Sequence, residues 1–441
     1  MSGIGKNFGQ VGAAPATTAP PAAFEAGRDR TLWFRSDFVR KVSETLAARG
    51  LTFCVGLAIS IFTARTLGPS GRGIYAAALV LTALGVQFGN FGLHAANTFF
   101  VAKDRSLLGG LVANALVVSA GVGIFFALIL GIFADLWPAA LPLQGTELIL
   151  SLVGIPFGVA YLLLQNLLLG CYHIRDFNRI EISNRSTNLL LLLGLTVFIT
   201  MVPALAIIAS LAAVILGIVL CFSSLARWSE LTAPSWQLFR KTFSYGCRPY
   251  LNAIFGFAVL KADLLLVARM LGTKEAGFYS VAVNLSDVLY VLPATIGSVL
   301  FPKLAQMSDH REKLKATTKV CVGVGIMMAA LAAIAALSSR HVIPLMFGAE
   351  FHASTPVFNW LLPGMVFMSL TSILSAYVAS ERIPWAVVWT YVVMSIVDVG
   401  LNLVWLPKIG IVGAAQLSSA CYLGCFVGIL LVARGIACEA N

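Results

Sequence analysis

A stretch of nineteen residues occurs twice in the chain. Thr63–Leu81 reads TARTLGPSGRGIYAAALVL, and Val267–Leu285 reads VARMLGTKEAGFYSVAVNL. At an offset of 204 residues, eight of the nineteen positions are identical, among them the pair Tyr75 and Tyr279. An internal repeat constrains a fold more strongly than any local pattern does. The sequence therefore predicts two related halves.

Each copy has the same physical layout. An apolar run ends at Arg65 or Arg269, and a short turn with glycines follows, where the backbone can take positive φ. Tyr75 or Tyr279 then opens the next apolar run, and a tyrosine ring at that place is typical of a membrane–water boundary. A helix hairpin explains one such copy, but two copies at one offset favour a duplicated membrane unit.

The composition predicts an all-α polytopic membrane protein. Of the 441 residues, 59% are hydrophobic and 11% are charged, and the mean hydropathy is +0.89. Soluble domains carry about 25% charged residues. A membrane helix needs about 20 apolar residues, which leaves room for about twelve spans. The net charge of +11 is explained by basic cytoplasmic loops, so we expect no nucleic-acid partner.

The chain divides into four predicted segments. Residues 1–42 form a disordered tail that includes RTLWFRSDFVRK, either a helix on the inner leaflet or a solvated lead-in. Residues 43–226 form an N-terminal six-helix bundle, 227–245 a cytoplasmic linker, and 246–435 a C-terminal six-helix bundle. The predicted spans are 46–64, 74–98, 109–134, 148–170, 186–202, 204–226, 246–268, 278–300, 317–338, 355–379, 386–406 and 411–433.

The distribution of basic residues orients these spans. The tail, the C-terminus and the loops on their side hold 21 of the 30 Lys and Arg residues. Cytoplasmic loops are enriched in these residues, so both termini are predicted to be cytoplasmic. Both halves then begin on the inside and form two parallel repeats. Eight cysteines are present without a CxxC pattern, and we expect no metal site among them.

Charged residues inside the spans are the candidate functional groups. Charge within a membrane helix is costly and usually faces a cavity or a partner. The seventh span contains Arg248, Lys261 and Asp263, and the eighth contains Asp287. Lys261 and Asp287 lie at similar depths, which predicts an ion pair. The pair either fastens two helices together or belongs to a cavity that binds an anionic head group.

Two further arginines flank the first span. Arg49 lies just inside its inner end and Arg65 at its outer end. The planar guanidinium suits phosphate because it makes two parallel hydrogen bonds. Snorkelling to lipid head groups is the alternative for each residue.

The eleventh span contains Asp398, with Asn402 one turn further on the same face. Together with Asp263 and Asp287, Asp398 is a candidate for coupling transport to a proton or sodium gradient. Hydrogen bonding between helices is the alternative for Asp398 and Asn402.

The second span carries a polar stripe. Gln87, Asn90, His94 and Asn97 recur at helical spacing, which indicates the wall of a wet cavity. We take Asn90 and His94 as candidate substrate-binding residues, although a single histidine is more often a packing residue. The chain contains no Walker A, GxSxG or HExxH motif, so we expect no catalytic residues, no cofactor and no enzyme activity.

Several segments together resemble a known family. The repeated LG-x4-G-x-Y unit, IGSVLFPKLA, PLMFGAEFHASTPVFNWLLPG, ILSAYVASERIP and LNLVWLPKIGIVGAAQLSSACY resemble the bacterial polysaccharide flippases. These O-antigen and exopolysaccharide exporters are related to the MATE transporters of the MOP superfamily. The resemblance covers about residues 40–435. One departure is Glu381-Arg382, where the family commonly has a glycine.

The resemblance implies two six-helix bundles around a central cavity, as in MATE transporters. The cargo would be a lipid-linked oligosaccharide on an undecaprenyl pyrophosphate carrier, moved across the bacterial inner membrane by alternating access for surface polysaccharide and lipopolysaccharide biosynthesis. Membrane lipids, a polysaccharide polymerase and glycosyltransferases are the candidate partners. The alternatives are a MATE-like cation or drug antiporter and a non-transporting scaffold for a glycan synthase.

Overall fold

The computed structural model describes residues 29–136, 141–307, 309–381 and 384–439. Side chains are described from Gly50 onward, except those at 134, 247–249 and 439. Within these ranges the secondary structure is helical. The elements are α1 Asp29–Gly89, α2 Leu93–Lys103, η1 Arg105–Leu107, α3 Leu108–Leu136, α4 Gly145–Gly170, α5 Ile174–Phe198, α6 Pro203–Ala226, α7 Trp236–Met270, α8 Thr273–Gln306, α9 His310–Phe347, η3 Ala349–Ala353, α10 Ser354–Glu381 and α11 Trp385–Glu439.

Residues 1–47 form a unit separate from residues 48–441. Of this first unit, residues 29–47 are helical and form the beginning of α1. The predicted interfacial helix therefore lies in a helical segment, but its side chains are outside the described residues, as is the tail over residues 1–28. The prediction that this helix lies on the membrane stays a prediction.

Four glycines make the turns at one end of the second unit. Gly68 has φ 64° and ψ −179°, Gly272 has 95° and 169°, Gly348 has 112° and 153°, and Gly410 has 64° and −168°. Backbone in this region is accessible almost only to glycine. Gly68 and Gly410 break α1 and α11 into two helical segments each. The glycines predicted to need positive φ are confirmed at Gly68 and Gly272.

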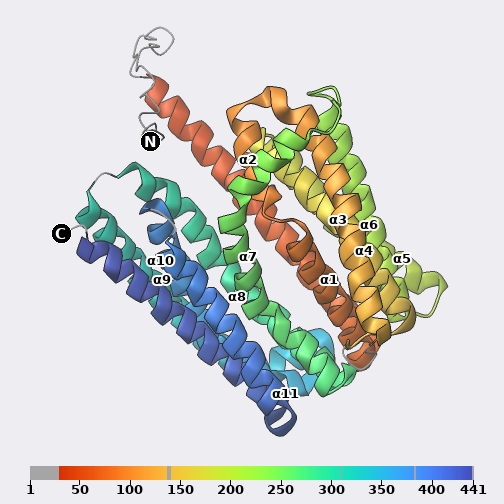
Figure 1. The fold of residues 1–441 in the computed structure, drawn as a ribbon. Coiled ribbons are helices and arrows are strands. Elements are labelled where there is room, and N and C mark those ends of the chain that lie inside the picture. The colour runs from red at the N-terminus through yellow and green to blue at the C-terminus, as the bar shows by residue number, and fades with distance from the viewer. Residues whose placement is uncertain (1–28, 137–140, 308, 382–383, 440–441) are drawn as a thin grey trace, which may run out of the picture. The chain divides into compact units, whose positions relative to one another are not determined.

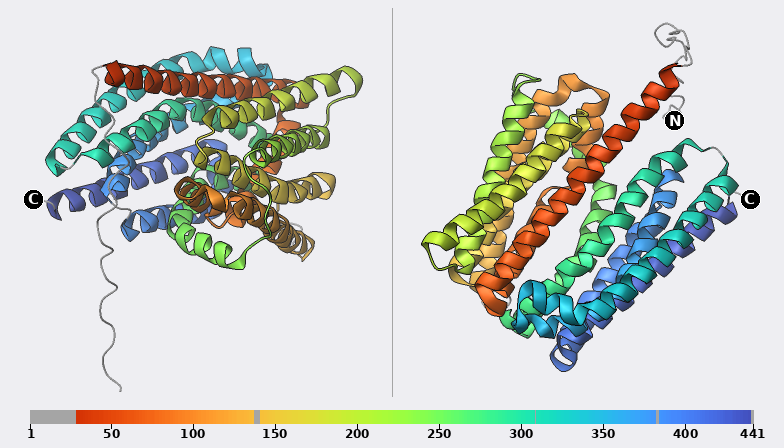
Figure 2. Two further views of the ribbon diagram at one scale, coloured as in Figure 1. Left: turned by 90° about the horizontal axis from the view of Figure 1, so that it is seen from above. Right: turned by 180° about the vertical axis from the view of Figure 1, so that it is seen from behind.

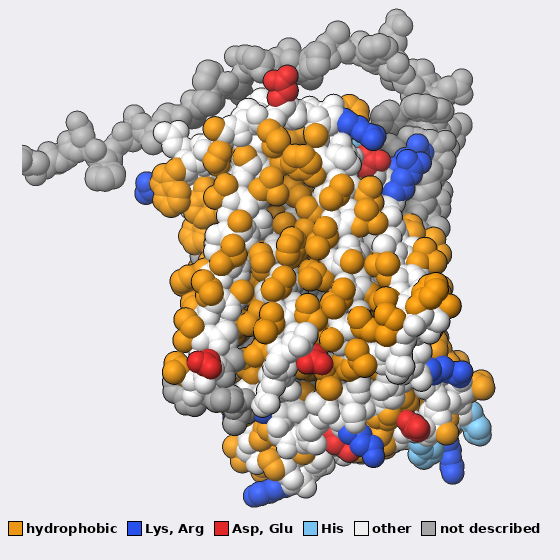
Figure 3. Space-filling model, turned by 90° about the vertical axis from the view of Figure 1, so that its right-hand side faces the viewer, with side chains coloured by type: hydrophobic (Ala, Val, Ile, Leu, Met, Phe, Trp, Pro, Cys, Tyr) orange, Lys and Arg blue, Asp and Glu red, His pale blue; other side chains and the backbone are white. Residues whose placement is uncertain are grey.

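The helices form an all-helical membrane protein. In the described part of the chain, nine helices are long and apolar enough to cross a membrane. Figure 3 shows a broad band of apolar side chains across one face, with most of the visible Lys and Arg near its two edges. A hollow of about 960 Å³ on α3, α4 and α6 is lined by apolar side chains apart from Ser119 and Asp135. We assign this hollow to the lipid-facing surface.

Two bundles organise residues 48–441. In the first, α3 packs on α4, α4 on α6 and α2, and α5 on α6. In the second, α10 packs on α8, α9 and α11, while α11 packs on α7. Figures 1 and 2 show α3–α6 and α8–α11 as two groups of helices. Helix α7 contacts both, because it also packs against α2.

The linker and α7 differ from the predicted boundaries. Asn114 of α3 holds the backbone of Ser235, accepting from its N–H at 2.9 Å and donating to its carbonyl at 3.0 Å. The Ser235 hydroxyl then caps α7 by accepting from the N–H of Leu238. Helix α7 therefore begins at Trp236, inside the predicted linker, and continues into the predicted seventh span.

The two copies of the repeated stretch pack against each other. A side chain added at Gly73 would collide with the backbone carbonyl of Thr273 and the backbone nitrogen of Gly277. One added at Gly277 would collide with the carbonyl of Pro69. Pro69 and Thr273 occupy the same place in the two copies, so the contact is reciprocal. The two bundles share an apolar core at this end, which we call the glycine end.

The two repeated tyrosines correct a prediction. Tyr75 and Tyr279 are 1% and 0% exposed, so their rings face the protein interior and not a membrane–water boundary. The hydroxyl of Tyr75 bonds Ser210 of α6 at 2.9 Å, and that of Tyr279 bonds Ser418 of α11 at 3.3 Å. Each ring therefore contacts the last helix of its own bundle through a serine, and the Tyr279 hydroxyl also donates to Asp263 of α7.

Candidate functional site

A cavity of about 480 Å³ lies between the two bundles, and we call it the chamber. Helices α1, α4, α5 and α6 line it from the first bundle, and α8 lines it from the second. Its wall contains the charged residues Arg72, Glu181, Arg185 and Asp287 and the amides Asn184, Asn188 and Asn284. Such a set can bind both an anion and hydroxyl groups.

Arg72 is a buried cation in the chamber wall. It was predicted to lie in a loop, but only 3% of it is exposed, because its side chain folds back along α1. Its guanidinium donates to the hydroxyls of Thr63 at 2.7 Å and Ser60 at 3.1 Å. Its Nε has no hydrogen-bond partner, and no described carboxylate pairs with it. Because buried charges are normally paired, Arg72 is suited to binding an anion.

Helix α5 presents a polar face to the chamber. Glu181, Asn184, Arg185 and Asn188 follow at helical spacing and all line it. Arg185 Nη2 lies 3.8 Å from Glu181 Oε1. A side chain at Gly56 of α1 would come within 3.3 Å of Arg185 Nη1, so this glycine leaves room for the guanidinium.

The residues of this face were missed as site residues. The predicted span began at residue 186, whereas α5 begins at Ile174, so Arg185 was assigned to a loop. The periodic polar pattern just before the apolar run is the signal that would have found them.

The predicted ion pair between Lys261 and Asp287 is confirmed. Lys261 Nζ lies 2.5 Å from Asp287 Oδ2, joining α7 to α8. Asp287 lines the chamber, and its side chain is 42% exposed against 21% for Lys261. An anion in the chamber could therefore compete with Asp287 for the ammonium of Lys261.

Asp263 is almost fully buried in the second bundle. Its Oδ1 accepts from the N–H of Leu264 at 2.8 Å. Its Oδ2 accepts from the hydroxyls of Tyr279 and of Ser418, the latter at 3.0 Å. Three helices therefore converge on one carboxylate, and one of its donors belongs to the repeated stretch.

Asp398 of α11 is a second buried carboxylate of the same bundle. It is 0% exposed and accepts from the Nδ2 of Asn402 at 3.2 Å, which confirms that the two share a face. Asp398 Oδ2 and Asn402 Oδ1 have no hydrogen-bond partner among the described residues. A buried carboxylate beside a free amide oxygen can hold a proton or a small cation.

The polar stripe predicted along the second span is wrong as a continuous helical face. The helix is interrupted between Gly89 and Leu93, where Phe91 and Gly92 take positive φ. Asn90 is buried, and its Oδ1 accepts from the N–H of Gly92 and bonds His94 Nδ1, both at 2.8 Å. Asn90 and His94 thus stabilise the break, and their predicted role in binding substrate stays a prediction.

The predicted arginines fall into two groups. Arg65 donates from Nε to the carbonyl of Met346 at 2.8 Å and from Nη2 to that of Leu345 at 2.5 Å. Its donors therefore bind the end of α9. Arg49 and Arg248 lie in α1 and α7, but their side chains are outside the described residues. Substrate binding by these three arginines stays a prediction.

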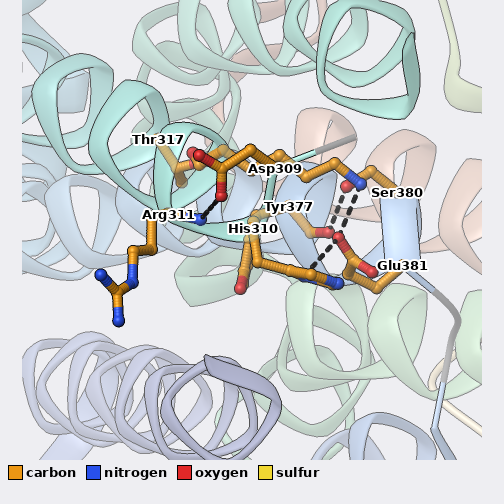
Figure 4. Close-up of polar contacts among 8 residues, drawn as sticks. Asp309, His310, Arg311, Thr317, Tyr377, Ser380 and Glu381 are labelled. Carbon is orange, nitrogen blue, oxygen red and sulfur yellow. Dashed lines mark hydrogen bonds and ion pairs between the residues drawn. The ribbon is translucent and has the colours of Figure 1, made fainter. Parts of the chain in front are cut away.

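A second polar cluster joins α9 to α10 at the end opposite the glycine end. Glu381 Oε1 lies 2.7 Å from the ammonium of Lys313 and 3.2 Å from Nδ1 of His310. Figure 4 shows Glu381 beside His310 and Tyr377. Lys313 is 6% exposed, so Glu381 compensates a buried cation. Glu381 belongs to the Glu381-Arg382 pair where the resembling family commonly has a glycine.

Comparison with known proteins identifies the family. The family described as "Polysaccharide biosynthesis protein" matches residues 62–356, more than half of the chain. A putative O-antigen transporter of Shigella flexneri is 24% identical over 31% of this chain and 33% of its own length. The lipopolysaccharide biosynthesis protein WzxC of Escherichia coli K12 is 34% identical over 25% of this chain and 23% of its own. The matches thus span a third or less of these relatives.

Solved structures show the fold. An inward-facing MATE family multidrug transporter of the MOP superfamily aligns with TM-score 0.70 at 14% identity, covering 88% of this chain and 95% of that one. The lipid II flippase MurJ, in an inward closed conformation, aligns with TM-score 0.69 at 13% identity, covering 88% and 87%. These likenesses confirm the predicted MATE-like fold. The chain belongs to the polysaccharide biosynthesis protein family and has the fold of the MOP superfamily.

Proposed function

We propose that the protein moves a lipid-linked oligosaccharide, carried on undecaprenyl pyrophosphate, from the inner to the outer leaflet of the bacterial inner membrane. The observation that carries this proposal is Arg72, a buried guanidinium without a carboxylate partner in the wall of the chamber. A pyrophosphate group would supply the missing negative charge. The names of the matched relatives, an O-antigen transporter and a lipopolysaccharide biosynthesis protein, support this cargo.

The architecture fits alternating access. Counting the two segments of α1 and of α11 separately, and adding α5, gives twelve spans in two parallel six-helix repeats. The basic residues of the loops favour cytoplasmic termini, and the glycine end then faces the periplasm. The shared core closes the glycine end, so the chamber would receive cargo from the cytoplasmic side.

Three basic side chains would act in sequence on the pyrophosphate. Arg185 is half exposed, so it can meet an entering anion. Lys261 would then leave Asp287 and bind the phosphate. Arg72 would bind the anion last, in the part of the chamber closest to the glycine end. The amides of α5 and α8 would bind sugar hydroxyls.

The buried carboxylates Asp263 and Asp398 are proposed as the coupling site for a proton or sodium ion. Both carboxylates are buried, so a cation that binds there would neutralise a costly charge. The Tyr279 hydroxyl on Asp263 links that residue to the repeated stretch. They are also the one feature that favours a cation antiporter. The chamber wall has two basic and two acidic residues, and both acidic residues have basic partners. Arg72 is left without a carboxylate partner among the described residues, which favours anionic cargo.

The test is the leaflet in which the cargo accumulates. In cells lacking the gene, undecaprenyl-linked oligosaccharide should accumulate on the cytoplasmic leaflet, and the native gene should restore export. A gene with Arg72→Ala and Arg185→Ala together should leave the cargo inside, while Arg340→Ala, on the exposed surface of α9, should restore export. Unchanged surface glycan in a deletion strain without a second family member would refute the proposal. Resistance to cationic compounds on overexpression would favour the antiporter.

A further inference from the structure

The closed glycine end contains two different kinds of contact between the bundles. The first is the reciprocal packing of Gly73 on Thr273 and of Gly277 on Pro69. Here the backbones approach so closely that no side chain larger than hydrogen fits at either glycine. Small residues allow such contact between membrane helices. Because equivalent residues meet, the contact has the self-complementary form of a two-fold interface.

The second contact is the pair of hydrogen bonds made by Arg65. Helix α9 ends at Phe347, so the carbonyls of Leu345 and Met346 belong to its last turn. The last carbonyls of a helix have no partner within it and carry partial negative charge. Arg65 of the first bundle satisfies two of them in the second bundle. The guanidinium is exposed, so water can replace these bonds when the bundles part.

The contact between the glycines lies next to the chamber. Arg72 and Tyr75 flank Gly73 in sequence and both line the chamber. Beyond them lies the shared core, which includes Ala64 of α1 and Ala268 of α7, both buried. A cargo leaving by this end must therefore separate the glycine contact.

We propose that the two copies of the repeated stretch form the outer gate of the transporter and that Arg65 is its latch. The gate closes when the glycine backbones meet, and Arg65 then ties α1 to the end of α9. This inference rests on the proposed function for the direction of exit. It assigns Arg65 a role in closing the gate that is separate from contact with cargo.

Accessibility of a buried cysteine tests the gate without any cargo. The eight native cysteines are replaced, Ala268→Cys is introduced as the reporter, and its reaction with a membrane-impermeant maleimide is timed on protein in nanodiscs. Ala268 is 4% exposed, so the reaction should be slow with the latch intact. Arg65→Ala should speed it about tenfold, since two charge-assisted hydrogen bonds are lost. Arg65→Lys should give an intermediate rate.

Matched variants distinguish opening of the gate from general destabilisation of the protein. Gly73→Ala should speed the reaction as Arg65→Ala does, whereas Gly323→Ala, whose added methyl meets open space, should not. Arg340→Ala, an exposed arginine on α9, is the control for Arg65. If Arg65→Ala does not accumulate, Arg65→Lys and Gly73→Ala decide the outcome.

The two proposals fail in different ways. Equal reaction rates in the variants of Arg65 and Gly73 and in their controls would overturn the gate, whatever the protein transports. Faster reaction in those variants would support the gate even if glycan export stays normal after gene deletion. Normal export in that strain would overturn the proposed cargo alone.

Discussion

The ammonium of Lys261 lies 2.5 Å from Oδ2 of Asp287, and the pair joins α7 to α8 at the edge of the chamber. Both side chains are partly exposed, so the pair should contribute about 1 kcal/mol or less to stability. Lys261→Ala should therefore lower the melting temperature by only a few degrees but reduce export at least about tenfold.

The exchange Lys261→Asp with Asp287→Lys distinguishes a structural pair from a functional one. Thermal melting of the purified protein and leaflet assays of the cargo measure the two effects separately. We expect the exchange to restore the melting temperature but not export, because the cation then sits on the other helix. Full recovery of export would show that the pair only fastens α7 to α8.

Arg72 should be dispensable for stability and required for transport. Replacing a buried unpaired cation by an apolar side chain of similar length removes a desolvation cost of several kcal/mol. Arg72→Met should therefore keep or raise the melting temperature while abolishing export. Arg72→Lys keeps the charge but loses the planar fork that reaches both Thr63 and Ser60, so export should fall in part. Normal export by Arg72→Met would exclude Arg72 from binding the cargo.

Asp398 should be needed for coupling and not for folding. Its Oδ2 is buried without a hydrogen-bond partner, so Asp398→Asn removes a charge whose burial is costly. We expect the variant to melt at or above the native temperature and to lose the dependence of transport on the ion gradient. Ser395→Ala on the same helix is the control, because Ser395 bonds the carbonyl of Phe255 instead. Gradient-dependent transport by Asp398→Asn would remove this residue from the coupling site.

Features that follow from local sequence pattern were predicted, and contacts made by long side chains to distant segments were missed. The repeat and the apolar spans come from composition and periodicity, and the pairing of Lys261 with Asp287 follows from similar depth on adjacent helices. The burial of Tyr75 could not be predicted, because its hydroxyl partner Ser210 lies on a helix distant in sequence. Tyr279 was missed although its acceptor Asp263 lies only one helix earlier, because both residues were read separately.

The location of one charge and of one helix break was also mispredicted. Arg72 follows the break of α1 at Gly68, and the sequence placed it in a loop between two spans. Its side chain reaches back to the preceding segment of α1, which buries its charge. The break in the second span was hidden because Gly92 appears as one glycine among several, and only Asn90, which accepts from its N–H, marks it as a turn.

Glu381 gives the last prediction, which concerns folding of the second bundle. Glu381→Gly leaves Lys313 buried without its carboxylate. Removing one partner of a buried pair costs about 3–5 kcal/mol, so the variant should melt several degrees lower and accumulate poorly. Adding Lys313→Met to Glu381→Gly should restore the melting temperature, because the unpaired charge is then gone. Glu381→Gly alone with an unchanged melting temperature would show that Lys313 reaches water or another partner.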